Sequence, residues 1–264
     1  MRVGSNKTSA IAASILGLMA ASAASAQYVA GDIWNRSTDW VDGTVQGSTE
    51  NNPGPDFAGN AVWFYEHVSG QGFDSQNPWY SQSSELMTWD TAWYNIGYGA
   101  WTVGDDVNPP IFSNRLTHNL AESSFDSSPM VRWTNPVQGG GTFSITGALN
   151  ILWTGHEFMG SAVDVDIMLA IDRVGEFELE PLLMTTISKP LNGDSVGDMV
   201  QIELDFELLF LAEGDSLILT HRAHESMNSR WIVMEDAMDI TLVPTPGAAA
   251  ILGLSSLALI RRRR

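Results

Sequence analysis

One stretch decides the fold class of this chain: Val200-Gln201-Ile202-Glu203-Leu204-Asp205-Phe206-Glu207-Leu208-Leu209-Phe210, in which apolar and polar residues alternate. The apolar set is Val200, Ile202, Leu204, Phe206, Leu208 and Phe210, against the polar set Gln201, Glu203, Asp205 and Glu207. A helix cannot gather residues of period two on one side, whereas a β-strand does so by its geometry. The stretch therefore predicts a strand whose six apolar side chains face a core.

The same alternation recurs on both sides of this stretch. Apolar residues alternate from Phe143 to Ile151 and from Val163 to Ile171, and a last strand is predicted over about Trp231 to Leu242. Gly139-Gly140-Gly141 and Ala212-Glu213-Gly214-Asp215 are typical of turns. Two-faced strands at short spacing, without helical segments between them, predict an all-β fold, an antiparallel β-sandwich or jelly roll.

The part before this region is different in composition. Residues 27–127 are rich in Gly, Ser, Asn and Asp, and they contain seven of the ten tryptophans, which are Trp34, Trp40, Trp63, Trp79, Trp89, Trp93 and Trp101. Short apolar runs and dense turn signals predict short strands with long loops and no helix. We expect residues 27–242 to form one β-sandwich domain, with residues 27–127 as its loop-rich aromatic part and residues 128–242 as its regular strands.

Composition and charge exclude several classes of protein. The chain has 264 residues, no cysteine and a formal net charge of -18. Six of its 13 basic residues lie at the two extremities, so the remainder carries 7 basic against 31 acidic residues, about -24. No disulfide framework can form. Such a negative surface repels phosphate backbones, so we expect no nucleic-acid partner.

The N-terminus carries the features of a secretory leader. Arg2 and Lys7 precede an apolar run from Ala10 to Ala20, and Ala24-Ser25-Ala26 matches the small-x-small pattern of a signal-peptidase site. The apolar run is too short to span a bilayer well. We expect residues 1–26 to form a signal helix, removed by signal peptidase to leave Gln27 as the new N-terminus.

The C-terminus carries a second short apolar segment. Residues 243–264 contain Pro244-Thr245-Pro246, then a run of 14 residues from Gly247 to Ile260, and they end in Arg261, Arg262, Arg263 and Arg264. As a helix the run reaches about 21 Å, against about 30 Å of bilayer hydrocarbon, so it is a marginal anchor. Its arginines should stay on the cytoplasmic face. The body would then lie across the membrane, on the side to which the leader directs it.

This tail resembles the PEP-CTERM sorting signal, with its Pro-x-Pro element, apolar helix and arginine cluster in the same order. Thr245 stands where that signal usually has glutamate, as in similar variants of planctomycete-type bacteria. The resemblance implies recognition by an exosortase-type membrane protease, cleavage near Pro244 to Pro246, and transient anchoring in the inner membrane. It implies a final location at the cell surface or outside the cell.

The regular strands resemble jelly-roll modules of the galactose-binding-like type. The resemblance covers roughly residues 128–242, with a Trp strand at Val131 to Trp133, an Asp-bearing strand at Val163 to Ile171, and a turn at Gly214-Asp215. Carbohydrate binding is common in that wider fold, although a fold does not fix a function.

The aromatic N-terminal part supplies the predicted ligand site. Aromatic rings stack on the apolar faces of sugars, and nearby polar side chains bind sugar hydroxyls. The cluster predicted to do so is Trp79, Tyr80, Trp89, Asp90, Trp93 and Tyr94, together with Asn95. The competing interpretation is that most of these aromatic side chains pack inside, between loop and sheet.

Candidate metal and catalytic residues are few. Asp164 and Asp166 share the polar face of one predicted strand, and Asn192-Gly193-Asp194 with Asp198 offers oxygen ligands of the kind that calcium prefers. The neighbouring His221 and His224 would point to opposite faces of a strand. We expect no cofactor, with calcium as the alternative, and leave any metal site unassigned.

Two functions follow from these features. The first is an exported, surface-sorted protein without enzymatic activity, associated with extracellular matrix or exopolysaccharide and binding carbohydrate. The alternative is a secreted glycoside-acting enzyme on a jelly-roll scaffold, which needs two carboxylates about 5 to 9 Å apart in a cleft. The expected partners are signal peptidase, the exosortase-type sorting protease and polysaccharide.

Overall fold

The computed structural model describes residues 28–69, 84–90, 100–102, 111–112, 116–120, 127–155, 163–176, 178–189, 199–223 and 230–244. The regular secondary structure in these ranges consists of β-strands, and all the strand pairs are antiparallel. The predicted all-β antiparallel class is confirmed. The predicted signal helix and sorting helix lie outside the described residues.

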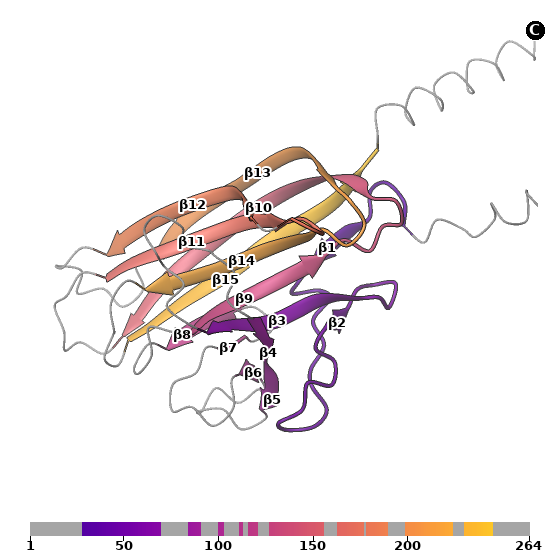
Figure 1. The fold of residues 1–264 in the computed structure, drawn as a ribbon. Coiled ribbons are helices and arrows are strands. Elements are labelled where there is room, and N and C mark those ends of the chain that lie inside the picture. The colour runs from indigo at the N-terminus through magenta and orange to yellow at the C-terminus, as the bar shows by residue number, and fades with distance from the viewer. Residues whose placement is uncertain are drawn as a thin grey trace, which may run out of the picture.

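The strands form two sheets, which Figure 1 shows as layers of long, roughly parallel arrows. The first sheet has the order β13-β10-β15-β8-β7-β6-β5, with β1 also paired to β15. Its strands are β1 (Ile33–Asn35), β5 (Thr88–Asp90), β6 (Ala100–Thr102), β7 (Ile111–Phe112), β8 (Leu116–Leu120), β10 (Gly141–Gly155), β13 (Met199–Leu211) and β15 (Arg230–Val243).

The second sheet has the order β12-β11-β14-β9-β3-β2, with β4 also paired to β3. Its strands are β2 (Gly54–Pro55), β3 (Ala61–Ser69), β4 (Ser84–Leu86), β9 (Ser127–Thr134), β11 (Val163–Asp172), β12 (Glu180–Lys189) and β14 (Ser216–Ala223). The loop-rich N-terminal part thus contributes strands to both sheets, because β1 pairs with β15 and β3 pairs with β9.

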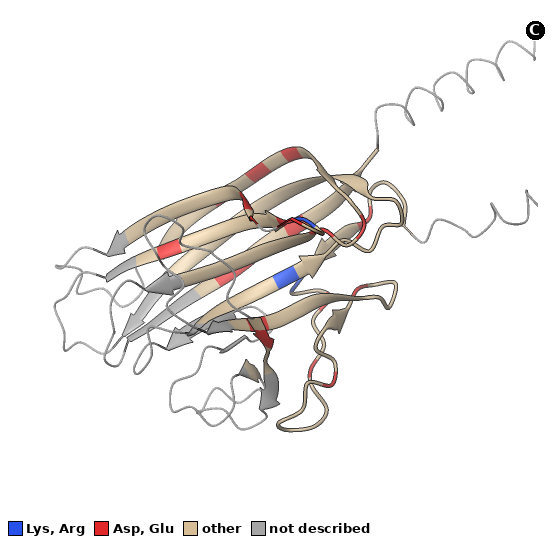
Figure 2. Cartoon of the chain, in the orientation of Figure 1, with Lys and Arg blue, Asp and Glu red and all other residues tan. Residues whose placement is uncertain are grey.

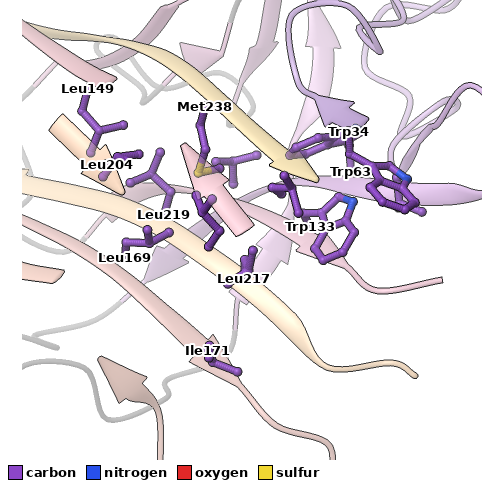
Figure 3. Packing of buried hydrophobic residues seen from close by; sticks show 14 of the residues in the cluster. Trp34, Trp63, Trp133, Leu149, Leu169, Ile171, Leu204, Leu217, Leu219 and Met238 are labelled. Atoms are coloured by element: carbon purple, nitrogen blue, oxygen red, sulfur yellow. The ribbon is translucent and has the colours of Figure 1, made fainter. Parts of the chain in front are cut away.

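The hydrophobic core lies between the two sheets and follows the predicted alternation. Inward-facing side chains of β10, β11, β14 and β15 fill it, and Met238, Ile240 and Leu242 of the predicted last strand belong to it. Figure 3 shows Leu149 and Met238 from one sheet meeting Leu169 and Leu219 from the other. Burial of these alternating aliphatic side chains is the main favourable term that holds the sheets together.

The prediction for β13 is correct up to Phe206 and wrong beyond it. Leu204 is buried and Phe206 is partly buried, but Leu208 and Phe210 are exposed, while Leu211 points inward. The cause is a β-bulge, since three steps along β13 from Phe206 match only two along β10. Leu208 takes a φ of 57° there, and the extra residue moves the following side chains to the other face.

The outer face of the second sheet carries a small apolar cluster of its own. Met168 and Ala170 of β11, expected on the polar side, pack with Met130 of β9 and Ile218 of β14, and Leu179 covers them. The alternation of β11 therefore separates two apolar environments rather than a core from solvent.

Candidate functional site

Most of the predicted ligand-binding cluster lies outside the described residues. Trp79, Tyr80, Trp93 and Tyr94 are among those outside. Trp89 and Asp90 belong to β5, in which Trp89 is the register partner of Trp101 in β6. The predicted aromatic platform therefore stays a prediction.

Four other tryptophans are core residues and cannot stack on a ligand from solvent. Trp34, Trp63, Trp101 and Trp133 are at most 1% exposed. Trp34 packs against Trp133 with ring centroids 5.4 Å apart, and Figure 3 shows both near Trp63. These four tryptophans pack inside, whereas for the predicted cluster itself the two interpretations stay open.

Asp56 organises the aromatic end of the core. Its carboxylate accepts hydrogen bonds from the hydroxyl of Tyr28, at 2.7 Å, and from the indole Nε1 of Trp34, at 2.9 Å. It also accepts from the backbone N–H groups of Ala58 and Asn60, at 2.9 Å each. A buried carboxylate needs such donors, and the role of Asp56 is to bind the N-terminal segment to the 56–60 turn.

An ion pair lies inside the sandwich next to this aromatic cluster. Arg36 donates from Nε to Oδ2 of Asp236 on β15, at 2.6 Å, and a second bond joins its Nη2 to Oδ1. The guanidinium lies 5.8 Å from the ring centroid of Trp40. Burial lowers the pKa of Arg36, but the charge and hydrogen bonds of Asp236, together with smaller contributions from Tyr65, outweigh this effect and the pKa is raised. Sequence reasoning missed this pair because its members are 200 positions apart.

Other buried carboxylates are also bound to structural partners. Glu66 accepts from Arg132, which reaches Asp172 as well. Asp215, in the predicted 212–215 turn, accepts from Arg173 at 3.1 Å and from the N–H groups of Ala212 and Val174. The three donors to the Asp215 carboxylate stabilise this turn, and they occupy the oxygen atoms that a catalytic carboxylate would use.

Burial shifts the pKa of other groups around Asp56. Desolvation raises the pKa of the Asp39 carboxyl, although that group accepts hydrogen bonds from Trp63 and from the backbone of Asn35. Desolvation, reinforced by the Asp56 carboxylate, also raises the pKa of the Tyr28 hydroxyl. Each shift has a packing cause, and each group belongs to the core that holds the N-terminal segment.

The polar candidates on β11 and β14 are separated by the sheet. Asp166 lies on the outer face of β11 and accepts from the hydroxyl of Thr186 at 2.6 Å. His221 lies on β14 and is buried. Among the described residues no three His, Asp or Glu side chains gather as metal ligands. The calcium candidates Asn192, Asp194 and Asp198 lie outside those residues, as does His224.

The outer face of the first sheet gathers the polar residues of three neighbouring strands. Carboxylates of β13 and β15 flank a central column on β10 in which the side chains are small. The register places Asp205, Thr146 and Asp239 in one row and Glu203, Ala148 and Ala237 in the next. We call this surface the acidic face. Figure 2 shows the acidic residues of the described strands, with few basic ones among them.

Asn150 ends the central column of the acidic face. It lies between Gln201 of β13 and Glu235 of β15. Its Oδ1 is shielded from solvent and accepts no hydrogen bond from any described group. A buried acceptor without a donor costs about 1 to 3 kcal/mol of folding free energy.

The two segments predicted to be processed adjoin the fold closely. Tyr28, the first described residue, has a buried side chain, and Val243 is the last of the described residues that is paired in a sheet, opposite Thr142. Pro244 follows and is exposed, while Ala24, Ala26, Thr245, Pro246 and the four arginines lie outside the described residues. No helix in the described ranges is long and apolar enough to cross a membrane.

Comparison with known proteins gives a likeness of fold. No protein-family model and no curated protein matches the sequence. The structure is similar to the CBM22-1 xylan-binding domain of Paenibacillus barcinonensis Xyn10C, at 11% identity and a TM-score of 0.33, over 83% of this chain and 99% of that one. It is also similar to the family 11 carbohydrate-binding module of Clostridium thermocellum, at 11% identity and a TM-score of 0.29, over 71% and 92%.

A third similar structure comes from another kind of protein. It is the K3 cleaved adhesin domain of Lys-gingipain from Porphyromonas gingivalis W83, at 12% identity and a TM-score of 0.31, over 58% of this chain and 90% of that one. At such low scores we base no functional inference on these likenesses.

Proposed function

We propose that this chain is an exported protein without enzymatic activity, delivered to the cell surface as a β-sandwich and associated there with polysaccharide. The observation that supports the proposal is how close the predicted cuts lie to the described part of the sandwich. Only Gln27 separates the predicted signal-peptidase site from the buried Tyr28, and Val243 is the last paired residue before Pro244-Thr245-Pro246. Both predicted cuts are therefore close in sequence to residues that are packed or paired in the sandwich.

The buried carboxylates support a role without catalysis. Asp56, Asp215 and Asp236 each accept hydrogen bonds from groups that hold a turn, a strand or the N-terminal segment. A glycoside-acting enzyme needs two carboxylates that face one substrate across a cleft. Asp56, Asp215 and Asp236 are engaged in these structural contacts, and Glu203, Asp205 and Asp239 lie on the acidic face.

Delivery is tested by the intact mass of the protein extracted from the surface of its own cells. A chain that starts at Gln27 and ends within 244–246 supports export and sorting. A full-length chain found in the cytosol overturns the proposal. Deletion of Arg261 to Arg264 is the matched control, since it removes the arginines that should hold the tail on the cytoplasmic face and leaves the body unchanged.

Polysaccharide binding is the finer part of the proposal, and two surfaces are candidates for it. One is the predicted aromatic cluster around Trp89 and Trp93. The other is the acidic face, where Thr146 and the flanking carboxylates offer oxygen acceptors to sugar hydroxyls. An acidic surface repels anionic polymers, so we expect a neutral polysaccharide as the ligand.

Pull-down on the exopolysaccharide of the organism, with a panel of neutral and uronic-acid glycans, tests this part. Trp89→Ala with Trp93→Ala removes the aromatic candidate, and Asn150→Ala with Glu235→Gln alters the acidic face. Thr186→Ala on β12 of the other sheet is the control. Loss of binding in one of the two double variants identifies the altered surface as the binding site. A wild-type chain that binds no glycan reduces the protein to a structural role at the cell surface.

A further inference from the structure

The first and last described segments of the chain lie side by side. The backbone N–H of Gly31 donates to the carbonyl of Leu242 at 2.7 Å, and the N–H of Leu242 donates to the carbonyl of Asp32 at 2.9 Å. Strand β1 then continues this pairing, with Ile33 opposite Thr241. In Figure 1 the indigo start and the yellow end of the ribbon accordingly meet at one end of the sandwich.

Four turns share that end with the two termini. The 135–140 turn joins β9 to β10, whose first residue, Gly141, follows it directly. Asn135 donates to the carbonyl of Ala212, which places the 211–216 turn beside it, and Arg173 donates to Asp215, which adds the 172–180 turn. The 56–60 turn is held there by the bond from Tyr28 to Asp56. We call these turns and the 28–32 segment the terminal end.

Three segments of the terminal end, and the adjoining end of β13, expose apolar side chains. Val29 is 60% exposed, Phe57 is 53%, Val174 is 68% and Phe210, at the end of β13, is 56%. Single exposed apolar residues are ordinary, but several exposed apolar side chains at one end of a domain indicate a contact surface. Arg173 brings Val174 and Phe210 together, because it precedes Val174 in the chain and its Nη1 donates to the carbonyl of Phe210 at 3.3 Å.

We propose that the terminal end rests on a lipid membrane, with Val29, Phe57, Val174 and Phe210 entering the headgroup region. The proposal rests on the proposed function, because it takes the apolar run Gly247 to Ile260 as the inserted anchor. Three residues, 244–246, separate Val243 from that run, and they span at most about 10 Å. An inserted tail therefore keeps this end, and not the opposite one, within reach of the lipid.

Because the inserted tail tethers the body to the membrane, even weak apolar contacts are sufficient to hold the terminal end against the lipid. Once the tail is inserted, contact of the body with lipid becomes intramolecular and its effective concentration is high. Asp32, Glu176, Glu178 and Glu213 also lie at the terminal end, with Arg173 as the basic residue among the described ones there. Because these carboxylates are repelled by anionic headgroups, contact should be closer on neutral lipid than on anionic lipid.

The absence of cysteine allows a direct test with single-cysteine labels on the full chain, tail included. Phe210→Cys and Met199→Cys form a matched pair, since both side chains are about half exposed, at 56% and 53%, on the same strand. The eleven steps between them place the two labels roughly 35 Å apart along β13. Val174→Cys and Met184→Cys form a second pair. Each variant carries an environment-sensitive dye and is reconstituted into phosphatidylcholine vesicles that contain a quencher within the bilayer.

We expect the dyes at positions 210 and 174 to shift to the blue and to be quenched at least about twofold more than those at 199 and 184. Addition of phosphatidylglycerol should reduce this difference, and salt should restore it. Equal, water-like emission at all four positions in vesicle-bound chain overturns the orientation and leaves the anchoring intact. A chain that does not float with vesicles overturns both. Shielding of positions 210 and 174 without lipid, together with a dimer in sedimentation, assigns the terminal end to a second copy and overturns the proposal.

Discussion

Arg36 and Asp236 show how a single residue pair can set the stability of the interior. Their side chains are 2% and 1% exposed, and two hydrogen bonds join them between the sheets. Two ions lose their hydration in such a place, and their mutual attraction offsets that loss only while both are present. The pair therefore tolerates joint replacement better than the loss of either member.

The first prediction follows from this asymmetry. Asp236→Ala should lower the free energy of unfolding by about 3 to 5 kcal/mol, because it leaves the Arg36 guanidinium buried and unpaired. The double variant Arg36→Met with Asp236→Leu should lose less than Asp236→Ala alone. Urea unfolding measures both, and Glu180→Gln, which removes the exposed partner of Arg173, should cost less than about 1 kcal/mol. A double variant at least as unstable as the single one would contradict the argument.

The raised pKa of the Tyr28 hydroxyl gives the second prediction, a loss of stability in alkali. The folded-state pKa lies above the unfolded value of about 10, so the unfolded chain ionises first. The contribution of Tyr28 is complete below about pH 10 and is lost as the pH rises toward the folded pKa. Tyr28→Phe should flatten the fall in the urea midpoint between about pH 9 and pH 11.5. An unchanged slope in the variant would mean that Tyr28 ionises equally in both states.

At the scale of elements, β13 and β10 show what the sequence could and could not predict. Period-two alternation predicts the strands, the antiparallel class and the inward side chains of β10, β11 and β15, because burial of one face imposes that period. It does not predict the bulge at Leu208, because the step from Glu207 to Leu209 still reads as a strand. Local pattern carries no information on how β10 pairs with it.

The candidate site was predictable to a smaller extent for the same reason. The carboxylates at positions 203 and 205 could be assigned to a polar strand face from the pattern alone. The acidic face itself depends on which strands are neighbours, and β10 lies between β13 and β15 only through long-range pairing. The burial of Trp34 and Trp101 was likewise unpredictable, since loop-rich sequence around a tryptophan is compatible with either a surface platform or a core.

The bulge gives the third prediction. Leu208 has a φ of 57° and is exposed, so its side chain gains little from packing while its backbone is strained. A residue with a Cβ pays roughly 1 to 2 kcal/mol in this region, and glycine does not. Leu208→Gly should therefore raise the free energy of unfolding by up to about 1 kcal/mol after the entropy cost of glycine, which urea unfolding measures. Leu208→Ala keeps the Cβ and should bring no gain, and a gain from Ala equal to that from Gly would refute the strain argument.

For the whole molecule, the neighbouring ends determine how processing and folding fit together. Leu242 is buried, and both of its backbone groups are bonded to the 31–32 segment, so the last strand also secures the beginning of the chain. Val243 still pairs with Thr142, whereas Pro244 is exposed. A protease that removes the tail can therefore act on the folded body only beyond Val243.

A truncation series tests this limit and gives the fourth prediction. A chain that ends at Pro244 should keep the stability of the longer chain within about 0.5 kcal/mol, because the removed residues lie past the last paired position. A chain that ends at Thr241 loses the Leu242 side chain and the bonds to Gly31 and Asp32, so it should be about 2 to 4 kcal/mol less stable. Its N-terminal segment should also become accessible to proteases. Equal stability of the two chains would show that pairing of Leu242 and Val243 does not restrict the proposed cut, which could then remove part of β15 without loss of stability.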